Sequence, residues 1–437
     1  MLRQIEGSKA VAEAVRVCRP EVISAYPISP QTHIVEHLSR LVKDGSLDPC
    51  AYINVDSEFS AMSGAIGASA AGSRTYTATA SQGLLFMAEA VYNASGLGLP
   101  IVMTVANRAI GAPINIWNDH TDSMSQRDCG WIQLFAEDNQ EAADLHIQAF
   151  RLAEEVSLPV MVCMDGFVLT HAVEAVDIPS QELVDSFLPP FEPRQVLDPN
   201  EPVSIGAMVG PEAFTEVRYL AHLRQMRALD EIPRVAADFK ALTGRDSGGL
   251  ISAYHLEDAD TIVVALGSVL GTLKDTVDEL REHGHRIGVL GIKSFRPFPL
   301  QAVRQALSGA HSVIVLERAL AVGIGGIVSE NIRTALAGMP IQTFTVIAGL
   351  GGRPILKRSL AAMLSEAEAG TLAALTFLDL RKDLVDREVA RTQSRRRSGP
   401  AAENILRDLG PSGDSYGGIP RYAADKPAQT EDKAVQR

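Results

Sequence analysis

The sequence predicts an α/β protein with two doubly wound parallel-sheet domains. Between Ala51 and Trp131, short β-prone runs alternate with helices of small residues, which is typical of βαβ units. The same alternation returns between Thr261 and Ile347. Polar residues gather where the first set of strands ends, and ligands bind at that edge of an open parallel sheet. We therefore expect a functional site on the first domain.

Length and composition set further limits. A chain of 437 residues is too long for one compact core. Its apolar runs break well short of the ~20 residues of a membrane span, and its first residues lack the apolar core of a signal peptide. A net charge of -13 argues against nucleic-acid binding. Widely spaced cysteines favour reduced thiols in the cytoplasm over zinc or iron–sulfur sites of the chain's own: Cys18, Cys50, Cys129 and Cys163.

The first 50 residues predict a helix at Ser8–Arg19 and a strand at Val22–Tyr26. The loop Pro27–Thr32 follows, and its prolines hold Ser29 in a stiff segment because each fixes φ and restricts the residue before it. Such a loop can aim the Ser29 hydroxyl at a ligand. Equally, the segment can be a plain helix start with Thr32 as N-cap.

The stretch from Ala51 to Trp131 carries the predicted site. Its strands are expected at Tyr52–Val55, Thr75–Ala78 and Ile101–Ala106, and its helices at Ser57–Ala71 and Leu84–Ser95. The polar residues at the strand ends are Asp56, Ser57 and Glu58, then Thr79, Ser81 and Gln82, then Asn107 and Arg108. Because the carboxyl ends of parallel strands meet at one edge, these side chains should converge.

The rest of the chain falls into four further parts. A short strand, a helix at Asn139–Ala153 and a strand at Pro159–Cys163 complete the first domain, 1–178. A proline- and glycine-rich connector spans 179–255 and contains one helix, Pro211–Ala228. The second domain, 256–385, should have strands at Thr261–Leu266, Arg286–Ile292, Ser312–Leu316 and Gln342–Ile347, and helices at Thr272–His283, Leu300–Leu307 and Ile327–Ala337. We expect an extended tail at 386–437, with one short helix at Ala401–Leu409, that is disordered or docked on another subunit.

Two glycine turns of the second domain open helices. They are Gly267-Ser268 and Gly323–Gly326. Backbone N–H groups at a helix start can cradle an anion, so each turn is a candidate anion site. Tight packing between strand and helix is the alternative explanation for both.

An ordered set of motifs links the chain to a known family. The set contains YPISPQT from Tyr26, SEFSAMSGAIGASAAG from Ser57, RTYTATASQGL from Arg74, ANRA from Ala106, APINIWNDHTD from Ala112, GIKSFRPFP from Gly291 and LERALAVGIGG from Leu316. On these motifs the chain resembles the α subunit of 2-oxoacid:ferredoxin oxidoreductases, especially the pyruvate type. The resemblance runs from about Gly7 to Asp383.

The resemblance implies a subunit of an enzyme that decarboxylates a 2-oxoacid oxidatively, forms acyl-CoA from coenzyme A, and passes electrons to ferredoxin or another acceptor. In that family, thiamin diphosphate lies between a pyrimidine-binding and a pyrophosphate-binding domain. This chain lacks a Gly-Asp-Gly motif with a suitable following Asn, so it looks like the pyrimidine-binding subunit alone. Its second domain resembles the C-terminal domain of transketolases. Mg and the iron–sulfur clusters would then belong to partners: a pyrophosphate-binding β subunit, and iron–sulfur and γ-type subunits.

The resemblance also assigns roles. Glu58 matches the glutamate that hydrogen-bonds N1′ of the aminopyrimidine, where a buried acid can relay a proton. The plain alternative is a favourable charge in the first turn of a helix capped by Asp56 or Ser57. Arg108 matches the arginine that clamps the substrate carboxylate, because a planar fork of donors suits that group. Otherwise Arg108 forms a surface or interface ion pair.

Other positions are assigned more loosely. Ser29 matches a threonine whose hydroxyl meets the substrate. His120 lies between Asp119 and Asp122, and we expect a hydrogen-bonded turn there rather than a metal site. The remaining positions near the cofactor by motif are Ser81, Gln82 and Asn107.

Two departures from the family pattern leave the substrate open. Ser29 replaces a threonine, and Phe59 replaces the histidine of Glu-Ser-Glu-His. A lost methyl and a gained aromatic would suit a bulkier aromatic 2-oxoacid such as phenylglyoxylate, although pyruvate is the family's commonest substrate. From a different class of function, the chain could be a non-catalytic structural subunit. Intact Glu58 and Arg108 motifs argue against that alternative.

Overall fold

The computed structural model describes residues 2–394 and 398–410. By its internal contacts the chain divides into two compact units, Met1–Asp379 and Leu380–Arg437. The first predicted α/β domain falls within the first unit, and the second, 256–385, runs six residues past its end. The predicted boundaries at 178, 255 and 385 stay predictions. Among the described residues, no helix combines the length and the apolarity needed to cross a bilayer.

The first sheet is parallel except at one edge. Its strands lie in the order β12-β6-β7-β5-β4-β2-β3. Their bounds are β2 Val22–Ala25, β3 Ala51–Asn54, β4 Thr75–Thr79, β5 Ile101–Asn107, β6 Ile132–Phe135, β7 Val160–Asp165 and β12 Ser294–Arg296. The strands predicted for the first domain are confirmed to within a few residues. The edge strand β12, which pairs antiparallel with β6, was not predicted and comes from the second domain's part of the sequence.

Helices cover both faces of this sheet. One face carries α1 (Gly7–Val17), α2 (Thr32–Lys43) and α7 (Asn139–Val156), and the other carries α3 (Glu58–Ala70), α4 (Ser81–Phe86) and α5 (Ala88–Leu97). Val102 of β5 packs in the core with α1 and α7, whereas Ile101 and Met103 pack with α3 and α5. Side chains alternate along a strand, so neighbouring residues serve opposite faces. The predicted helix Leu84–Ser95 is in fact two helices that break at Met87.

Smaller elements complete this part of the chain. The strands β1 (Arg3–Glu6) and β8 (Val173–Val176) form an antiparallel pair. The short helix α6 (Thr121–Ser125) follows β5, and α8 (Gln181–Phe187) opens the connector.

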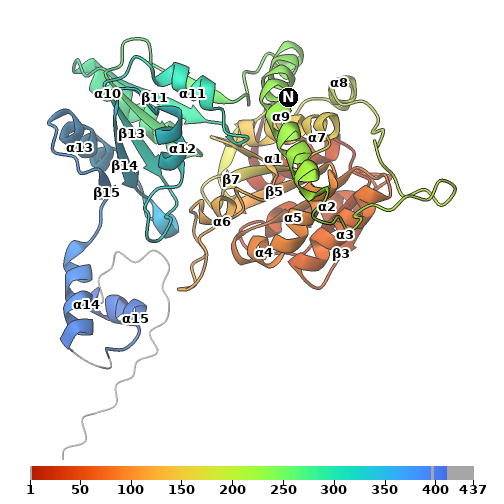
Figure 1. Cartoon of the computed structure of the whole chain (residues 1–437), viewed down its shortest axis with the longest axis horizontal. Coiled ribbons are helices and arrows are strands. Elements are labelled where there is room, and N and C mark those ends of the chain that lie inside the picture. Colours follow the sequence, from red (N-terminus) through yellow and green to blue (C-terminus); the bar gives the residue numbers. More distant parts are fainter. Residues whose placement is uncertain (1, 395–397, 411–437) are drawn as a thin grey trace, which may run out of the picture. The chain divides into compact units, whose positions relative to one another are not determined.

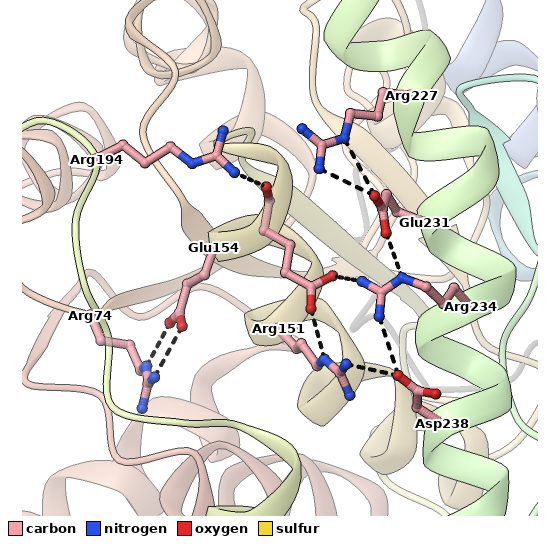
Figure 2. A network of polar contacts seen from close by, with 9 residues as sticks. Arg74, Arg151, Glu154, Arg194, Arg227, Glu231, Arg234 and Asp238 are labelled. Carbon is pink, nitrogen blue, oxygen red and sulfur yellow. Dashed lines mark hydrogen bonds and ion pairs between the residues drawn. The ribbon is translucent and has the colours of Figure 1, made fainter.

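The connector contains the long helix α9 (Phe214–Thr243), which packs on α7 and extends the predicted helix well past Pro233 (Figure 1). Arginines and acids hold the two helices together, as Figure 2 shows. Arg151 of α7 donates to Asp238 of α9 at 2.7 Å. Arg234 of α9 pairs with Asp238 on its own helix and with Glu155 of α7. The connector is therefore firmly attached to the first sheet.

The second sheet confirms the second predicted domain. Its strands lie in the order β15-β14-β13-β10-β11-β9, parallel except for β9. The strand bounds are β9 Ile251–Tyr254, β10 Thr261–Ala265, β11 Ile287–Ile292, β13 Ser312–Glu317, β14 Gln342–Ile347 and β15 Leu375–Phe377. The helices are α10 Val269–Glu282, α11 Leu300–Leu307, α12 Val328–Ala335 and α13 Lys357–Glu368, with a 3-10 turn η1 at Leu350–Gly352.

The two sheets share one hydrophobic core. It joins Met103 of the first sheet with Val264 and Val315 of the second. Between them, the rings of Phe135 on β6 and Phe295 on β12 meet edge to face, with centroids 6.4 Å apart. Strand exchange through β12 and a common core make the two sheets one packed body.

The expected extended tail is wrong for its described part. It contains α14 (Lys382–Ser394), which runs across the predicted boundary at 386, and α15 (Ala401–Asp408), which matches the short predicted helix. Polar pairs replace the missing apolar core here. Arg391 pairs with Asp408 at 2.8 Å, and Asn404 donates to Glu388 at 3.1 Å. The predicted tail beyond residue 410 lies outside the described residues.

Candidate active site

Asp122 of α6 holds the polar residues that follow β4 and β5. Its Oδ2 accepts hydrogen bonds from the backbone N–H groups of Ser81 and Arg108, each at 2.9 Å. Its Oδ1 accepts from Nδ2 of Asn107 at 2.8 Å and from the backbone of Ser123 at 2.7 Å. The side chain is fully buried, and this burial raises the pKa of Asp122 to about 6. One carboxylate therefore fixes three of the predicted site residues.

The backbone at Ser81 is strained. Its φ is 49°, in the left-handed region that residues other than glycine rarely adopt. The Ser81 hydroxyl donates to the carbonyl of Ala109 at 2.5 Å and also contacts Oε1 of Gln82. Strain of this kind persists where surrounding contacts over-determine it, often at functional sites. Here the bond from Ser81 N–H to Asp122 is one of those contacts.

Arg108 and Ser29 are directly linked. Nη1 of Arg108 donates to the carbonyl oxygen of Ser29 at 3.0 Å, and Nε donates to the carbonyl of Asn115 at 2.9 Å. The side chain is 7% exposed, and burial lowers the pKa of Arg108. Its other guanidinium N–H groups make no hydrogen bond to a described residue, so the fork keeps donors for an anionic ligand.

Gln31 stiffens the loop that carries Ser29. Its Nε2 donates to the carbonyl of Ala78 at 2.6 Å, and its Oε1 accepts from the backbone of Ile28 at 3.3 Å. Gln31 is also the N-cap of α2, without a side-chain capping bond. The alternative that made Thr32 the N-cap is therefore wrong, because the helix already begins at Thr32.

Glu58 opens α3 but does not cap it. Ser57 is the N-cap, and its hydroxyl accepts from the backbone N–H of Ser60 at 3.2 Å. The Glu58 side chain is buried, with 8% exposure. Its carboxylate has no hydrogen bond or ion pair with any residue that the structure describes. The plain alternative is met in its geometry, because Ser57 caps α3 and Glu58 places a negative charge in the first turn.

Gly83 lies directly against the side chain of Glu58. A Cβ added at Gly83 would lie 2.7 Å from Oε1 of Glu58 and 2.6 Å from Oγ1 of Thr79. Any larger residue would force these two side chains to move. Within the described part of the chain, Oγ1 of Thr79 is also buried without a hydrogen-bond partner. A carboxylate and a hydroxyl thus meet at a glycine, and neither is satisfied by the protein.

The second domain reaches this site through Asp165, at the end of β7. Asp165 accepts hydrogen bonds from Arg318 at 2.7 Å, from the backbone of Ser268 at 3.1 Å, and from Nε2 of His120 at 2.6 Å. Burial alone would raise the pKa of Asp165, but the charges of Arg318 and His120 outweigh it and hold the pKa well below its usual range. The backbone N–H of His120 also donates to the carbonyl of Arg318 at 2.7 Å.

Both glycine turns proposed as anion cradles are filled by carboxylates of the protein. At the start of α10, the N–H of Ser268 binds Asp165. At the start of α12, Ile327 and Val328 donate to Oε2 of Glu317 at 2.6 and 2.8 Å. The helix N-termini therefore hold internal anions that sit at the ends of neighbouring strands.

The structure brings the predicted site residues into one set. Arg108 touches Ser29, Asp122 links Arg108 to Asn107 and Ser81, and Gly83 lies against Glu58 two residues after Ser81. The central role of Asp122 was not predicted, because Asp122 was considered only as a neighbour of His120. The expected hydrogen-bonded turn at His120 is what forms. Asp165 was also missed, although it ends a strand like the others.

Two family models match the chain. Residues 13–236 match a family described as "Pyruvate flavodoxin/ferredoxin oxidoreductase, thiamine diP-bdg", and residues 259–359 match "Pyruvate:ferredoxin oxidoreductase core domain II". The chain is 49% identical over 392 residues to pyruvate synthase subunit PorA of Methanosarcina barkeri, covering 87% of this chain and 97% of that one. It is 40% identical over 362 residues to ketoisovalerate oxidoreductase subunit VorA of Pyrococcus horikoshii, covering 82% and 92%.

Solved structures share the fold. A 2-oxoglutarate:ferredoxin oxidoreductase from Magnetococcus marinus aligns with a TM-score of 0.69 at 19% identity, covering 84% of this chain and 65% of that one. An inactive split-gene transketolase aligns with a TM-score of 0.50 at 14% identity, covering 85% and 99%. The expected arrangement of a thiamin-binding domain with a transketolase-like second domain is confirmed at the level of the fold.

Proposed function

Because the chain belongs to the pyruvate flavodoxin/ferredoxin oxidoreductase family, we propose that it is the pyrimidine-binding α subunit of a pyruvate:ferredoxin oxidoreductase. The complex would decarboxylate pyruvate, transfer the acetyl group to coenzyme A, and pass two electrons through iron–sulfur clusters of partner subunits to ferredoxin. Relatives named pyruvate synthase favour pyruvate over the aromatic alternative. We place the complex in the cytoplasm, where the four free cysteines would stay reduced.

The observation that carries this proposal is the unpartnered carboxylate of Glu58. A buried acid without a partner is costly, so it is retained where a ligand completes it. The unpartnered hydroxyl of Thr79 and the backbone of Gly83 lie beside it. These groups fit the aminopyrimidine ring of thiamin diphosphate, which offers ring nitrogens and an amino group for hydrogen bonds. A non-catalytic structural subunit would have no need to keep this arrangement.

The residues of this chain would divide the work. When bound, thiamin diphosphate supplies the nucleophilic carbon and the electron sink that decarboxylation requires. Glu58 would hold a proton at N1′ of the ring. Arg108 would orient the substrate carboxylate with its spare donors, and the Ser29 hydroxyl would lie beside it. The supporting positions would be Ser81, Gln82 and Asn107.

A single arginine suits a carboxylate that must leave as CO₂. The clamp has to orient this group without over-stabilising its charge in the ground state. Arg108 already donates to the carbonyls of Ser29 and Asn115, and it is neutralised by no direct ion pair with a described residue. It can therefore hold the carboxylate while its own position is fixed by neutral partners.

Exposed apolar residues near the site support a partner subunit. Phe59 and Phe86 stack with centroids 6.4 Å apart and are 38% and 60% exposed. Ile114, in the loop that follows Arg108, is 82% exposed. Apolar surface of this kind usually marks an interaction site. We assign it to the pyrophosphate-binding β subunit, which would close over the cofactor and bring Mg. Phe59 then serves this face rather than the substrate pocket.

The test is proton exchange at C2 of bound thiamin diphosphate in the assembled complex, measured by NMR after a deuterium pulse. Glu58→Gln should slow the exchange by about 10²- to 10⁴-fold, the usual contribution of a general acid or base. Glu182→Gln is a matched control, because Glu182 also lies in the first turn of a helix with a serine N-cap. An exchange rate for Glu58→Gln within a few-fold of the control would refute the role of Glu58.

A further inference from the structure

Two histidines and a glutamate from distant segments meet beside the site. Glu6 ends β1, His33 lies in the first turn of α2, and His171 lies in the turn after β7. One ligand atom from each side chain lies within 4.8 Å of the other two. The imidazole rings of His33 and His171 have centroids 4.7 Å apart, and Nδ1 of His33 is 2.6 Å from Oε1 of Glu6. None of these residues has a part in the proposed reaction.

Backbone pairing sets the position of Glu6 against His171. In the β1–β8 pair, Glu6 faces Val173. The first two residues of α1 continue the contact, because Gly7 N–H donates to the carbonyl of Ala172 at 3.0 Å and Ser8 N–H donates to that of Thr170 at 2.9 Å. Glu6 and His171 are thus brought together by the sheet and not by their own side chains.

A hydrogen bond with Thr170 orients the imidazole ring of His171. Its Nδ1 lies 2.7 Å from the hydroxyl of Thr170, and that hydroxyl accepts the backbone N–H of Phe167 at 2.8 Å. Phe167 has a φ of 61°, a strained value for a bulky residue. Metal-binding histidines characteristically have one ring nitrogen held in this way, which leaves the other free for the ion.

An ion can reach these residues from solvent. The side chain of His33 is 47% exposed, which gives an ion a path from solvent.

We propose that Glu6, His33 and His171 form a binding site for a divalent metal ion of the zinc, cobalt or nickel type. Two imidazoles and one carboxylate match the donor preference of these ions and leave a position for water. The ion would tie the turn at His171 to the start of α2. That turn also abuts the substrate loop, because a Cβ on Gly166 would lie 2.6 Å from Cγ of Pro30. A bound ion would therefore stiffen the loop that carries Ser29.

The chain contains a natural comparison. His285 pairs with Glu368 at 2.8 Å, as His33 pairs with Glu6. The side chains of His285 and Glu368 are 33% and 36% exposed. Among the described residues, no third potential metal ligand joins that pair. If a histidine–glutamate pair were enough to attract an ion, both places would bind alike.

The experiment is a calorimetric titration of Zn²⁺ into the full chain, without an affinity tag and stripped of metal by a chelator. One ion should bind the wild type, and His171→Gln should weaken binding by about tenfold or more, since removing even an outer partner costs this much. His33→Gln should do the same, and His285→Gln should change nothing. Circular dichroism checks that each variant is folded, and the absorption of bound Co²⁺ reports the donor set independently.

Two outcomes would overturn the site. The first is a wild-type chain that binds no zinc. The second is equal affinity for wild type, His171→Gln and His33→Gln, which would mean that ions bind adventitiously elsewhere. Neither result bears on thiamin diphosphate or pyruvate, so the metal site can fail while the proposed enzymatic function stands.

Discussion

The carboxylate of Asp122 accepts a hydrogen bond from the backbone N–H of Arg108 at 2.9 Å. The same oxygen accepts the N–H of Ser81. A residue proposed for the substrate side and one proposed for the cofactor side therefore share a single buried acceptor. A substitution at Asp122 should therefore alter the positions of both Arg108 and Ser81.

Asp122→Asn should lower kcat/KM by about 10- to 100-fold, because displacing the residues that position a substrate by ~1 Å costs this much. The new amide group would present N–H donors to the N–H groups of Ser81 and Arg108. Leaving buried donors unpaired should also cost about 1–3 kcal/mol of unfolding free energy. Steady-state kinetics of the complex and chemical denaturation of the chain measure the two effects. Unchanged kinetics in a folded variant would contradict the role of Asp122.

The pH dependence of stability gives a second test of Asp122. Its pKa is raised from 3.8 to about 6, so the folded state holds this proton more tightly than the unfolded chain. The resulting stabilisation is complete below pH 3.8 and is lost as pH rises through about 6. Asparagine has no such titration. The unfolding free energy of wild type minus that of Asp122→Asn should therefore fall across this window, and a flat difference would contradict the raised pKa.

Arg108→Lys should raise KM and lower kcat/KM by roughly 10- to 100-fold. Lysine keeps the charge but loses the fork that donates to Ser29 and Asn115, and a charged hydrogen bond is worth about 1.5–3 kcal/mol. Pyruvate-dependent reduction of ferredoxin by the complex is the measurement. Arg127→Lys, on the segment after α6, is the control and should leave both constants unchanged. Equal effects of the two substitutions would exclude a specific clamp at Arg108.

Ser29→Thr should distinguish the candidate substrates. The carbonyl of Ser29, which holds Arg108, is untouched by this change, whereas the added methyl narrows the space beside the substrate. Pyruvate is small and should keep its kcat/KM within a few-fold. If the pocket accepts an aromatic 2-oxoacid such as phenylglyoxylate, kcat/KM for that substrate should fall. Parallel responses of both substrates would show that Ser29 does not set the size of the pocket.

Arg318→Met should destabilise the chain by about 3–5 kcal/mol, because it removes the arginine that pairs with Oδ2 of the buried Asp165 carboxylate. The double variant Asp165→Asn/Arg318→Met should recover part of that loss. Lys357→Met is the control, since it removes an exposed ion pair with Glu279 and should cost at most about 1 kcal/mol. Denaturant midpoints measure all three. If Arg318→Met lowers the unfolding free energy no more than Lys357→Met does, the pairing of Asp165 with Arg318 does not stabilise the fold.

Much of the fold was predictable because its signals are local. Alternation of β-prone runs and small-residue helices predicted both parallel sheets, since strand and helix periods are properties of short segments. The break of one predicted helix at Met87 and the long extension of α9 past Pro233 were missed. In both cases packing against the sheet and against α7 overrode the local pattern.

The sequence named candidate members of the site but not the connections between them. Motifs singled out Glu58, Arg108 and Ser29, and strand ends explained why they should converge. The sequence could not show that Ser57 caps α3 while Glu58 stays without a partner, because both residues are acceptable near a helix start.

By itself, the sequence determined the sheets, the strand-end polar residues and the family, all of which follow from short-range patterns. Tertiary structure alone decided which carboxylate meets which partner. Asp165 and Ser268 are 103 residues apart in sequence, and Asp165 and Arg318 are 153 apart. The glycine turn before α10 therefore looked like an open anion site until the fold placed Asp165 against it. Long-range pairs of this kind depend on which strand ends face one another, and no local propensity encodes that choice.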